Sequence, residues 1–189
     1  MTATNGLLKY IALGDDMKKE IENTIRVFAK RIYDIQFEEL PAGTKNSAVD
    51  RDSRIISDFI GCEVEKVTHS TYFILKHCKM WSESAIAMYE KFEGTHAARC
   101  HRGKSGHEFT IEHEYPLGIV KKMVQDKEFT SVDHVIKYMK KYAVPVIVTL
   151  EEDAKLRTTC RTANSLKEAK DRYKNVGIKV RRFEGVCDA

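Results

Sequence analysis

Residues 143–153, AVPVIVTLEED, decide the fold of the C-terminal part of this chain. The run from Val144 to Val148 is dense in β-branched side chains and predicts a strand, and its proline indicates a strand start or a sheet edge. Thr149, followed three residues later by Glu152, has the spacing of a capping box and predicts a short helix directly after the strand. A strand that passes straight into a helix is typical of an α+β fold.

Further elements surround this unit. Residues 109–113 alternate between apolar and polar side chains, which predicts a strand that Pro116 ends, and residues 178–183 predict a final strand. Short helices are expected over residues 117–125, after Thr130 or Ser131, and from the Ser165–Glu168 capping box to a stop at Gly177.

The first half of the chain has a helical pattern. Apolar residues recur every three or four positions over residues 17–35, and two aspartates at 15 and 16 would lie at the positive end of the helix. Residues 41–52 are polar and predict a loop, and shorter helices are expected over residues 53–61, 69–79 and 82–93.

These patterns together predict an α+β fold. We expect a helical region over residues 1–94, then a small antiparallel or mixed sheet with flanking helices over residues 95–189, both within one compact unit. The length of 189 residues is enough to bury a core without disulfides.

The cysteine content indicates a reducing compartment. Five cysteines are scattered along the chain without a CxxC pair, which favours free thiols over a disulfide framework. No apolar run approaches the length of a membrane span, and the N-terminus lacks the pattern of a signal peptide. We therefore expect a cytoplasmic protein with no membrane partner.

Positive charge is concentrated near the C-terminus. Residues 155–182 hold ten Lys or Arg against two acids, Glu168 and Asp171. A basic stretch of this kind favours a polyanionic partner, most simply nucleic acid. A solvated, lysine-rich helix face would produce the same composition.

The segment of residues 107–116, HEFTIEHEYP, holds most of the chemistry-bearing side chains. Three carboxylates and two imidazoles lie within eight residues. Such groups can bind a metal ion or transfer protons. Strand alternation, however, places Glu112 and Glu114 on the face opposite His113, so a joint Glu112–His113 site requires that the strand ends or bulges there.

Within this segment, residues 110–117, TIEHEYPL, resemble the start of the HNH (ββα-metal) nuclease motif, in which an acid–His pair ends a strand shortly before a proline. The resemblance implies that Glu112 binds a divalent metal, Mg²⁺ or Mn²⁺, and that His113 is the general base. The asparagine and the second metal-binding helix of that motif do not follow at its usual spacing. A second ligand would then come from the helix after residue 149, as Asp153 or Glu152.

A zinc site is the alternative metal centre. Cys and His side chains are the usual zinc ligands, although their spacing here matches no standard zinc knuckle. The candidates, grouped within eighteen residues, are His96, Cys100, His101, His107 and His113.

The sequence therefore predicts a protein that acts on nucleic acid, DNA in preference to RNA, as a divergent metal-dependent endonuclease of phage, restriction or defence type. Phosphate contacts are expected from Arg102, Lys104, Arg157, Arg161, Arg181 and Arg182. The alternative is a non-enzymatic regulator that binds a protein or an RNA. That alternative predicts tolerance of substitutions at Glu112 and His113.

Overall fold

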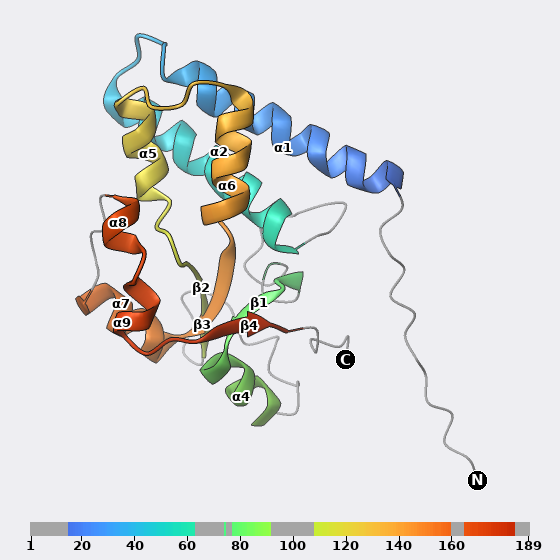
Figure 1. Ribbon diagram of the computed structural model, residues 1–189, viewed down its shortest axis with the longest axis vertical. Helices are drawn as coiled ribbons and strands as arrows, with labels where there is room; N and C mark the ends of the chain where they lie inside the picture. The colour runs from blue at the N-terminus through green and yellow to red at the C-terminus, as the bar shows by residue number, and fades with distance from the viewer. Residues whose placement is uncertain (1–14, 63–73, 75–76, 92–107, 160–164, 184–189) are drawn as a thin grey trace.

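The computed structural model describes residues 15–62, 74, 77–91, 108–159 and 165–183. Four helices gather at one end of the molecule, and a small sheet with shorter helices around it lies at the other (Figure 1). The four helices are α1 (Asp15–Ile35), α2 (Ala42–Cys62), α5 (Gly118–Gln125) and α6 (Val132–Tyr142). The sheet region holds β1 (Met80–Ser82), β2 (Phe109–His113), β3 (Pro145–Thr149) and β4 (Val180–Arg182), with α4 (Glu83–Lys91), α7 (Leu150–Thr159), α8 (Leu166–Ala169) and α9 (Arg172–Asn175).

Helix α1 confirms the predicted amphipathic helix. Its apolar stripe includes Ile25 and Ile32, which are buried in a core shared by α1, α2, α5 and α6. This stripe is therefore a core face, and burial of its aliphatic side chains stabilises the helical layer.

Helix α2 overturns the prediction of a loop over residues 41–52, because residues 42–52 form its first half. The buried face of this helix carries small polar side chains among the apolar ones, including Asp52, Ser53 and Ser57. Asp52 is held by Arg31 of α1 at 3.2 Å and by Arg51 at 3.1 Å. Since polar residues occupy core positions, the hydrophobic period of the helix is hard to see in the sequence.

The sheet has the strand order β2-β3-β1-β4. Strand β3 pairs antiparallel with β2 and parallel with β1, and β1 pairs antiparallel with β4, so the sheet is mixed. Pro145 is the first residue of β3, and the strand is central rather than at an edge. Strand β1 lies within the part of the chain that was predicted to be wholly helical.

Strand β3 contributes to a core on each face of the sheet. Ile147 packs in a cluster with Trp81 and Phe109, while Val148 packs in a second cluster with Leu156 of α7. All five residues of the strand are buried, which explains its near-continuous apolar sequence.

Two of the predicted helix starts are confirmed by their hydrogen bonds. The amide of His134 donates to Ser131 Oγ at 3.1 Å at the start of α6. At the start of α7, the amide of Glu152 donates to Thr149 Oγ1 at 3.1 Å, and the amide of Thr149 donates to Glu152 Oε2 at 3.0 Å. The second pair is the reciprocal arrangement of a capping box.

The helix expected from Ser165 to Gly177 is instead two short helices, α8 and α9, separated by a turn. Gly177 follows α9 with a φ of 75°, a conformation that favours glycine and ends the helix. The turn places Arg172 and Tyr173 on the second helix, and both side chains are buried. Arg172 is central to the site described below.

Replacement of Gly61 with alanine is expected to lower the free energy of unfolding by about 2–3 kcal/mol, because the added methyl group would overpack the core. A Cβ at Gly61 would lie 2.1 Å from Cγ of Pro145, within a ring that has little freedom to move. Urea denaturation of Gly61→Ala measures the loss. The matched control is Gly43→Ala in the same helix, where a Cβ meets nothing within 4 Å. Equal stability of the two variants would contradict the close contact.

Candidate functional site

A cleft of about 840 Å³ lies between α2 and the outer edge of strand β2. Its walls come from α2, β2, the start of α5, α7 and α9. The charged and titratable side chains that line it are Asp50, Arg51, Arg54, Asp58, Glu112, His113, Lys121, Arg157 and Arg172. A cleft in which ionisable side chains from separate elements converge is the usual place for a binding or catalytic site.

One face of α2 forms one wall of the cleft. Its lining residues lie at positions 47, 50, 51, 54, 55 and 58, which are the three- and four-residue steps of a single helix face. Asp50 accepts hydrogen bonds from Arg54 at 3.0 Å and from Lys121 of α5 at 2.9 Å. Burial alone would raise the pKa of Asp50, but these two hydrogen bonds lower it below its ordinary value. Two cations thus share one carboxylate at this wall.

The edge of β2 forms the opposite wall. Within the described part of the sheet, β2 has a neighbouring strand on one side only. Four consecutive residues, 110–113, line the cleft, because side chains from both faces of an edge strand can contact a cleft that lies beside that edge. Glu112 and His113 therefore share a cleft although their side chains point to opposite faces. His113 is the last residue of the strand.

His113 is held in place by Ser57 of α2. Ser57 Oγ lies 2.8 Å from His113 Nε2, and Ser57 is fully buried. Burial, together with the positive charges of Arg54 and Arg172, lowers the pKa of His113 to about 4, while Asp50 acts in the opposite direction. The imidazole is therefore neutral at pH 7. In the tautomer in which Nε2–H donates to Ser57 Oγ, Nδ1 carries no proton and is the nitrogen that can accept one.

Glu112 is the centre of a second group of interactions. Its Oε2 accepts a hydrogen bond from Arg172 at 3.2 Å and one from the amide of His113 at 3.3 Å. Burial raises the pKa of Glu112, the guanidinium of Arg172 opposes that rise, and the nearby carboxylate of Asp153 adds to it. Two adjacent residues thus have pKa values displaced in opposite directions, which is typical of sites that transfer protons.

Arg172 fixes the end of strand β2. It is 5% exposed and donates through Nη1 to the carbonyl oxygen of His113 at 2.8 Å as well as to Glu112. Within the described residues, its Nε and the hydroxyl of the adjacent Tyr173 are buried without a hydrogen-bond partner. A buried arginine that binds both a side chain and a backbone carbonyl determines where that backbone lies.

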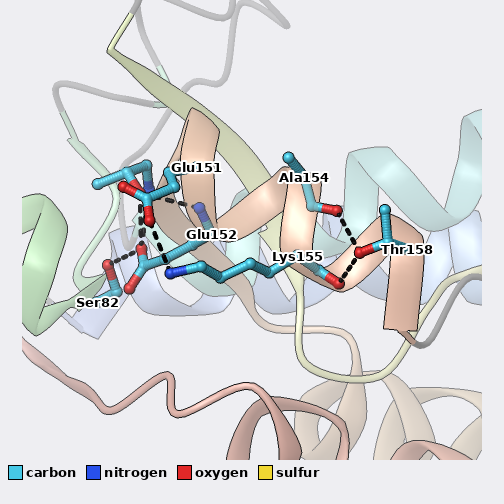
Figure 2. Close-up of polar contacts among 7 residues, drawn as sticks. Ser82, Glu151, Glu152, Ala154, Lys155 and Thr158 are labelled. Atoms are coloured by element: carbon cyan, nitrogen blue, oxygen red, sulfur yellow. Dashed lines mark hydrogen bonds and ion pairs between the residues drawn. The ribbon is translucent and has the colours of Figure 1, made fainter.

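The two predicted second metal ligands have other contacts. Figure 2 shows the Glu152 carboxylate directed at Ser82, whose hydroxyl donates to Oε2 at 2.6 Å, and the same oxygen caps α7 through Thr149. Asp153 lies close enough to Glu112 to raise its pKa, but it is paired with Arg157 at 2.8 Å. In the described parts of the chain, no group of three His, Cys, Asp or Glu side chains could hold a metal ion. Glu152 and Asp153 are thus engaged by other side chains, and the expected metal centre stays a prediction.

The predicted phosphate contacts are not gathered in one place. Arg157 lines the cleft, whereas Arg181 and Arg182 lie on β4, at the edge of the sheet away from β2. Arg102, Lys104 and Arg161 lie outside the described residues, as do four of the five candidate zinc ligands, His96, Cys100, His101 and His107.

Sequence reasoning missed several charged residues of the cleft, chiefly Arg54, Lys121 and Arg172. The helical spacing of charges over residues 47–58 could have identified Arg54. Arg172 is 60 positions from Glu112, and Ser57 is 56 positions from His113, so no local sequence pattern indicated either contact.

Acidification should destabilise the protein through His113. Its pKa is depressed on folding, so neutral His113 contributes stability that is fully present above pH 6.5 and is lost as the pH falls toward 4. Between pH 7 and pH 4, the free energy of unfolding of the wild type should fall by about 2 kcal/mol more than that of His113→Gln. Urea denaturation at several pH values measures this difference. Parallel pH profiles for the two proteins would show that His113 is not held neutral.

None of the helices described has the length and apolarity needed to cross a membrane. Comparisons with protein-family models, with curated proteins and with solved structures gave no match. Any functional inference therefore depends on the chemistry of the cleft between α2 and β2.

Proposed function

We propose that this protein binds nucleic acid in the cleft between α2 and β2 and cleaves its phosphodiester backbone, with His113 as the general base. The observation that carries the proposal is the placement of a neutral imidazole beside cationic side chains from four different helices. Cations of this kind bind phosphate, and a neutral imidazole can remove a proton from an attacking hydroxyl group.

The charge of the cleft favours an anionic ligand. Five cationic and three acidic side chains line it, a net charge of two positive units. Asp50 is a single carboxylate between Arg54 and Lys121, so one of these two cations can bind a phosphate without leaving a carboxylate unpaired. Arginine and lysine at such a site supply affinity rather than sequence choice.

Glu112 and Arg172 have a supporting role in this proposal. Together they bind the amide and the carbonyl oxygen of His113, so they fix the backbone from which the imidazole projects. Both are positioning residues for His113. In this arrangement Glu112 makes an ion pair with a buried arginine, which differs from the metal-ligand role that the HNH resemblance implies.

Binding to nucleic acid is expected to weaken steeply with salt and to depend on Arg54. Removal of one phosphate contact should lower the slope of log affinity against log salt by about 1. Fluorescence anisotropy with labelled single-stranded oligonucleotides measures this slope for the wild type and for Arg54→Gln. The control is Arg26→Gln, because Arg26 pairs with Asp133 on the exposed surface of α1 and α6. Equal slopes for both variants would place the binding surface outside the cleft.

A second candidate function is a non-enzymatic interaction protein. It is favoured by the observation that the cleft cations already have carboxylate partners, such as Asp153 for Arg157 and Glu112 for Arg172. In that case the network would stabilise the fold and His113 would have no chemical task. Unchanged function after substitution of His113, together with salt-insensitive binding to a protein, would favour this alternative.

A further inference from the structure

We infer that the substrate of the cleft is single-stranded RNA, which is cleaved without a metal ion by attack of its own 2′-hydroxyl group on the adjacent phosphate. The inference rests on the proposed function and adds the substrate class and the nucleophile. It replaces DNA, the substrate favoured by the sequence, because the side chains of the cleft suit a reaction in which the protein supplies only a base and positive charge.

Two carboxylates of the cleft are already paired with cationic side chains. Asp50 binds Arg54 and Lys121, and Glu112 binds Arg172. A divalent cation would have to displace these side chains and would then lie beside them, against their charge. Hydrolysis of DNA needs an activated water molecule, and in proteins a metal ion commonly supplies that activation. RNA carries an internal hydroxyl group that needs only a base.

The base of the proposed reaction is His113. His113 is oriented by Ser57 and projects from a strand end that Arg172 and Glu112 fix. In the reaction, Nδ1 of His113 takes the proton of the 2′-hydroxyl group, a bond forms between O2′ and phosphorus, and the bond from phosphorus to O5′ breaks. The leaving O5′ takes a proton from water. The products are a 2′,3′-cyclic phosphate and a free 5′-hydroxyl end, and His113 then returns its proton to solvent.

Cationic side chains line the cleft from separate elements. Arg54 and Lys121 lie on one side of the cleft, on α2 and α5, whereas Arg157 and Arg172 come from α7 and α9. A phosphate between these groups would be stabilised as negative charge grows on its non-bridging oxygens.

The size of the cleft suits a single strand. A volume of about 840 Å³ falls within the range of sites for small ligands and is enough for one phosphate with the nucleosides on either side of it. Single-stranded segments are also the form in which proteins most often recognise RNA bases, because unstacked bases can enter a pocket.

The test compares three oligonucleotides of one sequence: all-RNA, all-DNA, and RNA with a single 2′-deoxyribose at the mapped cleavage site. The wild-type full chain is incubated with each in EDTA and in Mg²⁺, and products are identified by mass spectrometry. His113→Ala and the surface control His134→Ala are assayed in parallel.

We expect the wild type to cleave RNA in EDTA and to leave a cyclic phosphate end. The cleavage rate should fall by about 100-fold or more when the cleavage site carries 2′-deoxyribose. His113→Ala should show a similar fall in rate, and His134→Ala should not. Cleavage that needs Mg²⁺, or that cuts DNA or leaves a 5′-phosphate, would overturn this inference while the proposed function stands. Absence of cleavage of every substrate by folded protein would overturn both.

Discussion

Replacement of His113 with alanine is expected to abolish cleavage, with a fall in kcat of about 10²–10⁴-fold, which is the usual contribution of a general base. Nucleic-acid binding should change little, because the cations of the cleft remain. Single-turnover kinetics with labelled oligonucleotides, beside binding isotherms for the same variant, separates the two effects.

The variant also loses the hydrogen bond between Ser57 and the imidazole, so stability must be measured in parallel. His113→Gln keeps a side-chain amide near Ser57 and serves as the second variant. His134→Ala is the matched control, since His134 lies at the start of α6 and does not line the cleft. A folded His113→Ala protein that cleaves at the wild-type rate would remove His113 from the chemistry.

Replacement of Arg172 with methionine is expected to lower the free energy of unfolding by about 3–5 kcal/mol, because removal of one partner of a buried ion pair leaves the other charge uncompensated. The Arg172 side chain is 6% exposed and that of Glu112 is 22% exposed. The carbonyl oxygen of His113 would lose its donor as well. Urea denaturation of the variant at pH 7 measures the loss.

A double-mutant cycle identifies the cause of that loss. If the unpaired carboxylate of Glu112 is responsible, Arg172→Met combined with Glu112→Gln should recover part of the stability. The surface control is Arg26→Met, where loss of the exposed pair with Asp133 should cost under about 1 kcal/mol. A loss in Arg172→Met no greater than in Arg26→Met would show that the buried pair does not hold the strand end.

Much of the fold could be predicted because its signals are local. The amphipathic stripe of α1, the serine cap of α6 and the capping box of α7 each lie within a few consecutive residues. Strands β2 and β3 followed from the patterns at residues 109–113 and 144–148, but the parallel pair with β1 that makes the sheet mixed did not. Strand β1 could not be predicted, since it is three residues long and exists through pairing with β3 and β4.

The first half of α2 was missed for a different reason. Asp52, Ser53 and Ser57 occupy buried positions where a sequence pattern expects apolar residues. Asp52 is tolerated there because Arg31 and Arg51 pair with it, and Ser57 binds the His113 ring. The contacts with Arg31 and His113 cross between elements, so the sequence of α2 alone could not show that these polar residues face inward.

The candidate site could be predicted only in its local part. Glu112 and His113 are adjacent in sequence, and both line the cleft. Their partners Arg172 and Ser57 are brought to them by packing of the helices against β2. The prediction of Glu152 as a metal ligand remains a prediction, although its carboxylate caps α7 and binds Ser82. Short-range motifs thus identified Glu112 and His113, which line the cleft, but not Arg172 and Ser57, which bind them.

The most direct test of the central claim is an NMR titration of the histidine side chains of the wild-type protein with a short single-stranded RNA oligonucleotide. We expect the imidazole resonances of His113 to shift with saturation, because a bound phosphate lies beside the ring, and those of His134 to stay unchanged. Saturable binding that leaves the His113 resonances unmoved would show that nucleic acid does not enter the cleft between α2 and β2.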